Sequence, residues 1–375
     1  MSTTPGIALE HTAERSGRRR HLDAVCNVLA GPIAILWVLY LVVANLRAAN
    51  PAFDFQHAYW HAGHRVLLGQ SPYLWTAAQF REKLAFVYPA LSAVMFAPLS
   101  LIPRSTGAVL FTFVSVALLP LTLWVLRVRD WRVYGIAALW QPFYDGWMTA
   151  NESIYLMFGL ACVWRVRDRS WMAGLLTAVL ISLKPLLWPL GLWLLATRRW
   201  RASLYTLAWA VVLNLVAWGI VGFGQIGAYL HASAVSTADA WRGGFGLPAF
   251  LGRLGLDWHS GLVVLLVVSA VVVAALIRSG RHGHGDHYAL VLMVALALVS
   301  SPQLSAHYML LLLVPLALLR PRLDWLWAVP VLLWVSLPTE PVSGWQQVCA
   351  WVLVGGSCLA LVRQTARPTT LEPAL

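Results

Sequence analysis

The sequence predicts an all-α polytopic membrane protein. Of its 375 residues, 59% are hydrophobic and only 11% are charged, whereas a soluble domain has about 25% charged residues. The apolar residues form long runs, and tryptophan, which is enriched where helices meet lipid head groups, occurs 21 times. This composition excludes a cytosolic enzyme, a disordered chain and a secreted disulfide-bonded scaffold.

The apolar runs that justify this fold follow one another along the chain. We expect the first membrane helix at about 26–46, and further runs lie at about 86–102, 107–126, 133–149, 153–164, 171–183, 186–197, 203–222, 261–278, 288–301, 308–319, 324–337 and 344–362. A crossing takes ~20 residues, so some of these short runs are paired or partial, and we predict about 11–13 transmembrane helices. No internal repeat and no soluble domain is evident.

The charge pattern indicates a topology. The chain has 27 Lys and Arg against 15 Asp and Glu, and the Arg residues form short clusters between apolar runs. Such clusters face the cytoplasm, so we expect anionic lipid and no nucleic acid as their partner. Residues 1–25 and 365–375 are predicted to be cytoplasmic tails, and 26–364 a single transmembrane domain of the plasma membrane.

The connections between the Arg clusters are then expected outside. They are the stretch 47–85, the Asn151-Glu152 turn, the loop 223–260 and the polar region 301–307, with Lys184-Pro185 near the same side. One conflict remains open, because two full crossings at 86–102 and 107–126 would place Arg127 outside. Either one of these runs is re-entrant, or this Arg cluster departs from the rule.

The stretch 47–85 contains the first candidate for chemistry, Asp54. Asp54, His57, His61 and His64 are spaced i, i+3, i+7 and i+10, which on an α-helix is one face. We expect an amphipathic helix on the outer membrane surface, where a partly desolvated carboxylate is a good general base. A helix N-cap or a solvated acid is the alternative. His57 and His61 have the spacing of two metal ligands, but no further acid or Cys set joins them, so we do not expect a metal.

Three further polar positions interrupt apolar sequence, where charge is functional by default. Lys184, between two apolar runs, either snorkels to the interface or binds a phosphate as a point charge. Glu152 either complements the start of a helix or faces the external cavity together with Asn151. His307, in a polar break, lies in a simple loop or in a site where it hydrogen-bonds a phosphate or tunes an acid.

These residues resemble a known family. Residues 54–73 resemble the D-x-x-x-x-Y-x-x-A-G-x-x-x-L-x-G-x-x-P-Y signature of bacterial family 87 glycosyltransferases. The family's later blocks are matched in order by Phe86-Val87-Tyr88-Pro89, Ala97-Pro98-Leu99 with Ile102-Pro103, Leu183-Lys184-Pro185 with Arg198-Arg199-Trp200-Arg201, and Ser301-Pro302 with His307. The resemblance runs from about 45 to 320 of this chain.

The resemblance implies a GT-C membrane fold with an external catalytic loop, here 47–85. It implies a polyprenyl-phosphate sugar donor, usually mannose, a glycolipid or lipoglycan acceptor, and an inverting transfer that we expect to form an α-1,2 linkage. Arabinofuranose is the alternative sugar, because arabinosyl donors are also used in the family. No cofactor and no divalent metal is expected beyond the lipid-linked donor.

The resemblance also assigns residues. It makes Asp54 the general base and places His307 and Lys184 at the donor site, with His307 as a second catalytic residue. We expect Tyr59, Tyr73, Tyr88, Asn151 and Glu152 in the same donor site. A lipid flippase or transporter is the alternative from another class, but such proteins show internal repeats and acids within spanning helices. A structural subunit of a larger assembly is a third hypothesis.

Overall fold

The computed structural model describes residues 24–47, 52–82, 84–281, 285–336 and 342–366, and within these ranges it contains helices and no strand. The α-helices are α2 (Ala34–Arg47), α3 (Trp60–Leu67), α4 (Ala77–Arg81), α5 (Ala90–Phe96), α6 (Arg104–Val125), α7 (Trp131–Ala138), α8 (Gln141–Met148), α9 (Ser153–Val166), α10 (Ser170–Leu183), α11 (Pro189–Ala196), α12 (Trp200–Val221), α13 (Ile226–Gly243), α14 (Leu247–Arg253), α15 (Trp258–Arg281), α16 (Gly285–Val299), α17 (Leu313–Leu319), α18 (Trp325–Ala328) and α19 (Gly344–Ala366). The π-helical segments are η1 (Leu29–Ile33) and η2 (Phe55–Tyr59), and the 3-10 segments are η3 (Pro98–Leu101), η4 (Pro185–Leu187), η5 (Phe223–Gln225), η6 (Ala306–Leu312) and η7 (Val329–Ser336). Most of the two predicted tails, 1–23 and 367–375, lies outside the described residues.

The protein is an all-α polytopic membrane protein, as the sequence predicts. Five of the described helices are long and apolar enough to cross a membrane, namely Ala24–Ala44, Arg104–Val125, Trp200–Val221, Trp258–Ser279 and Gly344–Thr365. Seven shorter apolar segments of 10–17 residues lie between them in the described chain. Several of these are too short to span alone, since a crossing takes ~20 residues.

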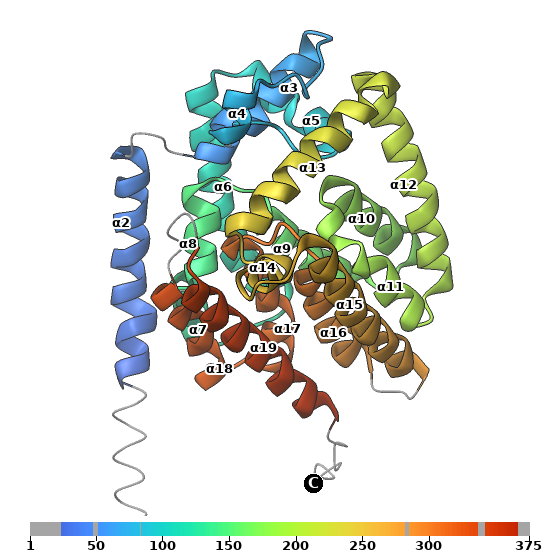
Figure 1. The fold of residues 1–375 in the computed structure, drawn as a ribbon. Coiled ribbons are helices and arrows are strands. Elements are labelled where there is room, and N and C mark those ends of the chain that lie inside the picture. Colours follow the sequence, from blue (N-terminus) through green and yellow to red (C-terminus); the bar gives the residue numbers. More distant parts are fainter. Residues whose placement is uncertain (1–23, 48–51, 83, 282–284, 337–341, 367–375) are drawn as a thin grey trace, which may run out of the picture.

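The first membrane helix stands at the edge of the bundle (Figure 1). Pro32 lies within it, and the π-turn η1 surrounds this proline. Proline has no N–H to donate, and a widened turn accommodates the missing hydrogen bond without ending the helix. Ile35 and Leu36 are mostly exposed, as expected of side chains that face lipid.

The conflict around 86–102 has a structural answer. This run folds as two short pieces, α5 and η3, which pack against α3 and together cover only Ala90–Leu101. Pro89 precedes α5, Pro98 begins η3 and Pro103 precedes α6, so helical hydrogen bonding is interrupted three times. This arrangement favours the re-entrant alternative, with α6 as the only full-length crossing between Ala90 and Arg127.

The two long connections are helical, although the stretch 223–260 was expected to be a loop. That segment forms α13 and α14, and α13 runs diagonally across the bundle from the end of α12 (Figure 1). Gly222, with φ of 99°, provides the turn before it. In the stretch 47–85, α4 begins with a capping box between Thr76 and Gln79.

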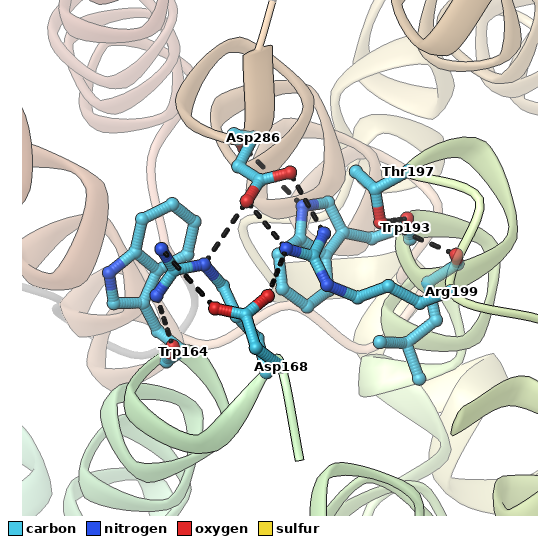
Figure 2. A network of polar contacts seen from close by, with 8 residues as sticks. Trp164, Asp168, Trp193, Thr197, Arg199 and Asp286 are labelled. Atoms are coloured by element: carbon cyan, nitrogen blue, oxygen red, sulfur yellow. Dashed lines mark hydrogen bonds and ion pairs between the residues drawn. The ribbon is translucent and has the colours of Figure 1, made fainter. Parts of the chain in front are cut away.

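An ion-pair network joins α16 to two of the turns between neighbouring helices (Figure 2). Asp286, in the first turn of α16, accepts hydrogen bonds from Arg199 at 2.7 and 2.8 Å and from Arg167 at 3.1 Å. Arg199 also contacts Asp168 at 2.9 Å. The Arg167 guanidinium lies over the Trp164 ring. The network therefore connects α16 to the α9–α10 and α11–α12 turns.

Replacing Asp286 with Asn should destabilise the protein. The substitution removes the charge that Arg167 and Arg199 share, and we expect a loss of about 1–3 kcal/mol because the pairs are only partly buried. In thermal unfolding in detergent, Asp286→Asn should have a lower melting temperature than Asp257→Asn. The latter is a matched substitution at an exposed carboxylate. Equal melting temperatures would show that the network does not stabilise the fold.

Candidate active site

A cavity of about 820 Å³ brings together residues from all of the segments predicted to lie outside. Asp54 and Glu82 come from the stretch 47–85, Asn151 from the α8–α9 turn, and Lys184 from the α10–η4 junction. The cavity is also lined by Tyr88, Asp145, Val235, Ser236, Asp239, Gln303, His307 and Tyr308. The cavity thus combines chain segments that are far apart in the sequence.

Asp54 is fixed in the cavity wall by the α8–α9 turn. Its backbone N–H donates to the Thr149 carbonyl at 2.8 Å, and its Oδ2 accepts a hydrogen bond from Asn151 Nδ2 at 2.6 Å. Asn151 Oδ1 accepts from the Ser153 backbone N–H at 2.9 Å. This last contact fixes the amide orientation, because a backbone N–H can only donate. Asp54 Oδ1 has no hydrogen bond in the described part of the chain.

Two alanines in the left-handed region flank this pair. Ala52 has φ of 53° and Ala150 has φ of 51°. This conformation costs roughly 1–2 kcal/mol for a residue with a Cβ atom, so the surrounding packing must hold both turns in place. Such strain is concentrated at functional sites. Here it places Asp54 and Asn151 opposite each other.

The surroundings of Asp54 change its acidity. Burial raises the pKa of the Asp54 carboxyl above its ordinary value of 3.8. The charges of His307 and Lys184 and the Asn151 hydrogen bond act in the opposite direction but do not cancel this effect. A carboxylate with a raised pKa is a stronger base than an exposed one.

Lys184 is held in the cavity by its own backbone. Pro185 disfavours helical geometry in the residue before it, and Lys184 accordingly ends α10 with an extended backbone. Its Nζ lies 3.4 Å from Glu152 Oε1, 3.9 Å from the centre of the Tyr88 ring and 4.8 Å from that of Tyr308. The Lys184 side chain is 16% exposed. It therefore does not snorkel into solvent, and its ammonium is a fixed cation in the cavity wall.

Three residues predicted at the donor site do not line the cavity. Tyr59 OH donates to Tyr88 OH at 3.0 Å, and Tyr73 OH donates to the Tyr88 carbonyl at 2.9 Å. Glu152 pairs with Lys184. Tyr59, Tyr73 and Glu152 thus support the lining residues Tyr88 and Lys184 instead of facing the cavity.

Asp54, His57, His61 and His64, predicted to share one face, do not line the cavity together. Of the four, only Asp54 lines the cavity. The π-helical segment η2 begins directly after Asp54, and its wider turn changes the angular spacing that an α-helix would give. His61 instead contacts Arg104, and His64 stacks on Trp60. Among the described residues, no group of three or more His, Cys, Asp or Glu could hold a metal ion.

His307 lines the cavity from η6, and it has a partner that the sequence analysis did not select. His307 Nδ1 lies 3.0 Å from Asp145 Oδ2. Asp145 and Tyr308 are cavity residues that sequence reasoning missed. Tyr308 adjoins His307 in the chain, which is a weak signal. Asp145 lies six residues before Asn151, but nothing in that spacing points to His307, 162 positions away.

Comparison with known proteins identifies the family. The sequence model of Glycosyltransferase family 87 matches residues 86–302. The chain belongs to glycosyltransferase family 87. The matched region contains Tyr88, Asn151 and Lys184, whereas Asp54 precedes it and His307 follows it. As a member of family 87 the protein is an enzyme, a glycosyltransferase, and the flippase hypothesis is set aside.

Curated relatives of this family 87 member are similar over much of its length. A polyprenol-phosphate-mannose-dependent alpha-(1-2)-phosphatidylinositol pentamannoside mannosyltransferase of Mycolicibacterium smegmatis is 26% identical over 77% of this chain and 70% of its own length. Its counterpart in Mycobacterium tuberculosis is 25% identical over 70% of this chain and 62% of its own. An alpha-(1->3)-arabinofuranosyltransferase of Corynebacterium glutamicum is 27% identical, but this match covers 54% of the chain and 51% of the relative. No solved structure is significantly similar to the chain.

Proposed function

We propose that this family 87 enzyme transfers mannose from polyprenyl-phosphate mannose to a glycolipid or lipoglycan acceptor at the outer face of the plasma membrane. One observation carries the proposal: the Asp54 carboxylate and the Lys184 ammonium line the same cavity. A base for the acceptor and a cation for the departing phosphate are the two groups that such a transfer needs. The two mannosyltransferases among the relatives support the choice of sugar and of an α-1,2 linkage.

The donor would be held by its phosphate. A polyprenyl chain stays in the bilayer, so the phosphate that it carries lies at the membrane edge, where the Lys184 and His307 side chains are available. Lys184 would contact the phosphate oxygens as a point charge. The rings of Tyr88 and Tyr308 hold the ammonium in position without neutralising it. Glu152 balances this charge when the donor is absent.

The transfer would be a single displacement. Asp54 takes the proton from the acceptor hydroxyl, whose oxygen forms a bond to C1 of the sugar. The bond between C1 and the phosphate oxygen breaks, and its electron pair leaves with the polyprenyl phosphate. One displacement inverts the anomeric centre, so a β-linked donor gives an α-linked product and no protein nucleophile is required.

The proposal is tested with purified protein and two donors. Incubation with polyprenyl-phosphate mannose and a phosphatidylinositol-mannoside acceptor should give a product that is one hexose heavier by mass spectrometry. Polyprenyl-phosphate arabinose is the second donor, because one relative is an arabinofuranosyltransferase. Transfer of arabinose alone would replace mannose in the proposal, and no transfer from either donor would reject it.

The pH dependence of transfer should reflect the burial of Asp54. Burial raises the pKa of this carboxyl above 3.8, and a general base works only when it is ionised. We therefore expect kcat/KM to fall with decreasing pH through a limb that lies above 3.8. A pH–rate profile of the purified enzyme measures this limb. A rate that stays constant down to the ordinary carboxyl value would contradict Asp54 as the base.

A further inference from the structure

The contact between Asp145 and His307 is not used by the mechanism above. Asp145 lies in α8 and His307 in η6, and Asp145 Oδ2 is 3.0 Å from His307 Nδ1. The side chains are 22% and 10% exposed, respectively. Both residues line the cavity. The close contact between Asp145 and His307 within the cavity therefore calls for a functional explanation.

The local packing is built for this contact. Gly146 follows Asp145, and a Cβ atom at Gly146 would lie 2.6 Å from Ser153 Oγ and 3.3 Å from His307 Cβ. A side chain at position 146 would displace Ser153 Oγ and press on His307 Cβ, so glycine here accommodates the close packing of η6 on α8. The close approach brings the His307 ring to the Asp145 carboxylate.

The contact also determines which ring nitrogen is left for a ligand. An ionised carboxylate only accepts hydrogen bonds, so Nδ1 must carry the hydrogen that is donated to Asp145. Nε2 remains, and it is buried without a hydrogen-bond partner among the described residues. Buried polar atoms are almost always paired. The exception at Nε2 therefore points to a partner that arrives with the substrate.

We propose that Asp145 is a positioning residue that orients His307 so that Nε2 meets the phosphate of the lipid-linked donor. The inference rests on the proposed function and specifies how its leaving group is stabilised. With Nδ1 held by Asp145, Nε2 faces the phosphate, and a protonated imidazole donates its Nε2–H to a phosphate oxygen. The phosphate gains one negative charge as its bond to C1 breaks. The hydrogen bond therefore strengthens during transfer, and its loss lowers kcat more than it raises KM.

A double-mutant cycle tests this role. Asp145→Asn should lower kcat by about 10- to 100-fold, the range seen when the hydrogen-bond partner of a metal-bound histidine is removed. The KM for the donor should change little. His307→Gln keeps a side-chain nitrogen near the Nε2 position, whereas His307→Asn places one near Nδ1, so the Gln variant should be the more active. In the His307→Gln background, Asp145→Asn should have no further effect, because the two residues act as a unit.

Several outcomes would overturn the inference. Equal losses from Asp145→Asn in the wild-type and His307→Gln backgrounds would show that Asp145 acts independently of His307. A rise in KM with unchanged kcat would make Asp145 a ground-state binding residue. Higher activity of His307→Asn than of His307→Gln would exclude Nε2. Asp257→Asn is the matched control, since its carboxylate is exposed and contacts Ser260. Absence of transfer by the unaltered enzyme would instead reject the proposed function itself.

Discussion

The substitution Asp54→Asn should reduce kcat for sugar transfer by about 10³-fold, within the range that general-base catalysis contributes. The substitution keeps the size of the side chain and an oxygen that can accept the Asn151 hydrogen bond, and the backbone contact to Thr149 is unaffected. An amide cannot take up the acceptor proton. The loss should therefore appear in the chemical step, with the fold preserved.

Donor binding separates this loss from a structural effect. Removing a negative charge from a cavity that receives a phosphate should leave the donor affinity equal or increase it. Binding of polyprenyl-phosphate mannose to purified Asp54→Asn, measured by native mass spectrometry, gives this value, and size-exclusion chromatography checks the fold. Turnover by Asp54→Asn at the wild-type rate would remove Asp54 from the mechanism.

Lys184 and Glu152 form the second test with a large expected effect. Lys184→Met leaves the Glu152 carboxylate buried without its cation, and breaking a buried pair in this way costs about 3–5 kcal/mol. Glu152 is only 6% exposed in its side chain, so solvent cannot compensate for the lost partner. We expect Lys184→Met to be both destabilised and inactive. This result alone would not separate the role of Lys184 in stability from its role in sugar transfer.

The double variant Lys184→Met/Glu152→Gln separates them. It removes both charges, so it should regain most of the melting temperature that Lys184→Met loses. Its transfer activity should stay at least about 10²-fold below wild type, because the cation for the departing phosphate is absent. Thermal unfolding and the transfer assay on the same preparations measure both effects. Recovery of activity together with stability would show that Lys184 serves only to neutralise Glu152.

Local sequence signals account for much of the fold. The long apolar runs predicted α6, α12, α15 and α19 to within a few residues, since hydropathy over ~20 residues reports directly on membrane insertion. Lys184 was placed between two apolar runs, and the chain does break there because proline restricts the residue before it. The signature around Asp54 indicated the family, which the match over 86–302 establishes.

Other features depend on contacts that no local pattern encodes. Tyr59 and Tyr73 belong to the same signature as Asp54, yet they support Tyr88 instead of lining the cavity. Of Asp54 and the three histidines that the α-helical spacing placed beside it, only Asp54 lines the cavity.

The sequence by itself determined the membrane class, the positions of the long helices and the family, because hydropathy, proline breaks and short motifs act within one segment. Only the tertiary structure decided which polar groups meet. The partners Asp54 and Asn151 are 97 positions apart, and Asp145 and His307 are 162 apart. Their pairing follows from the close approach of helices at Gly146 and from two strained alanine turns. Packing sets these features, and local residue preferences do not reveal them.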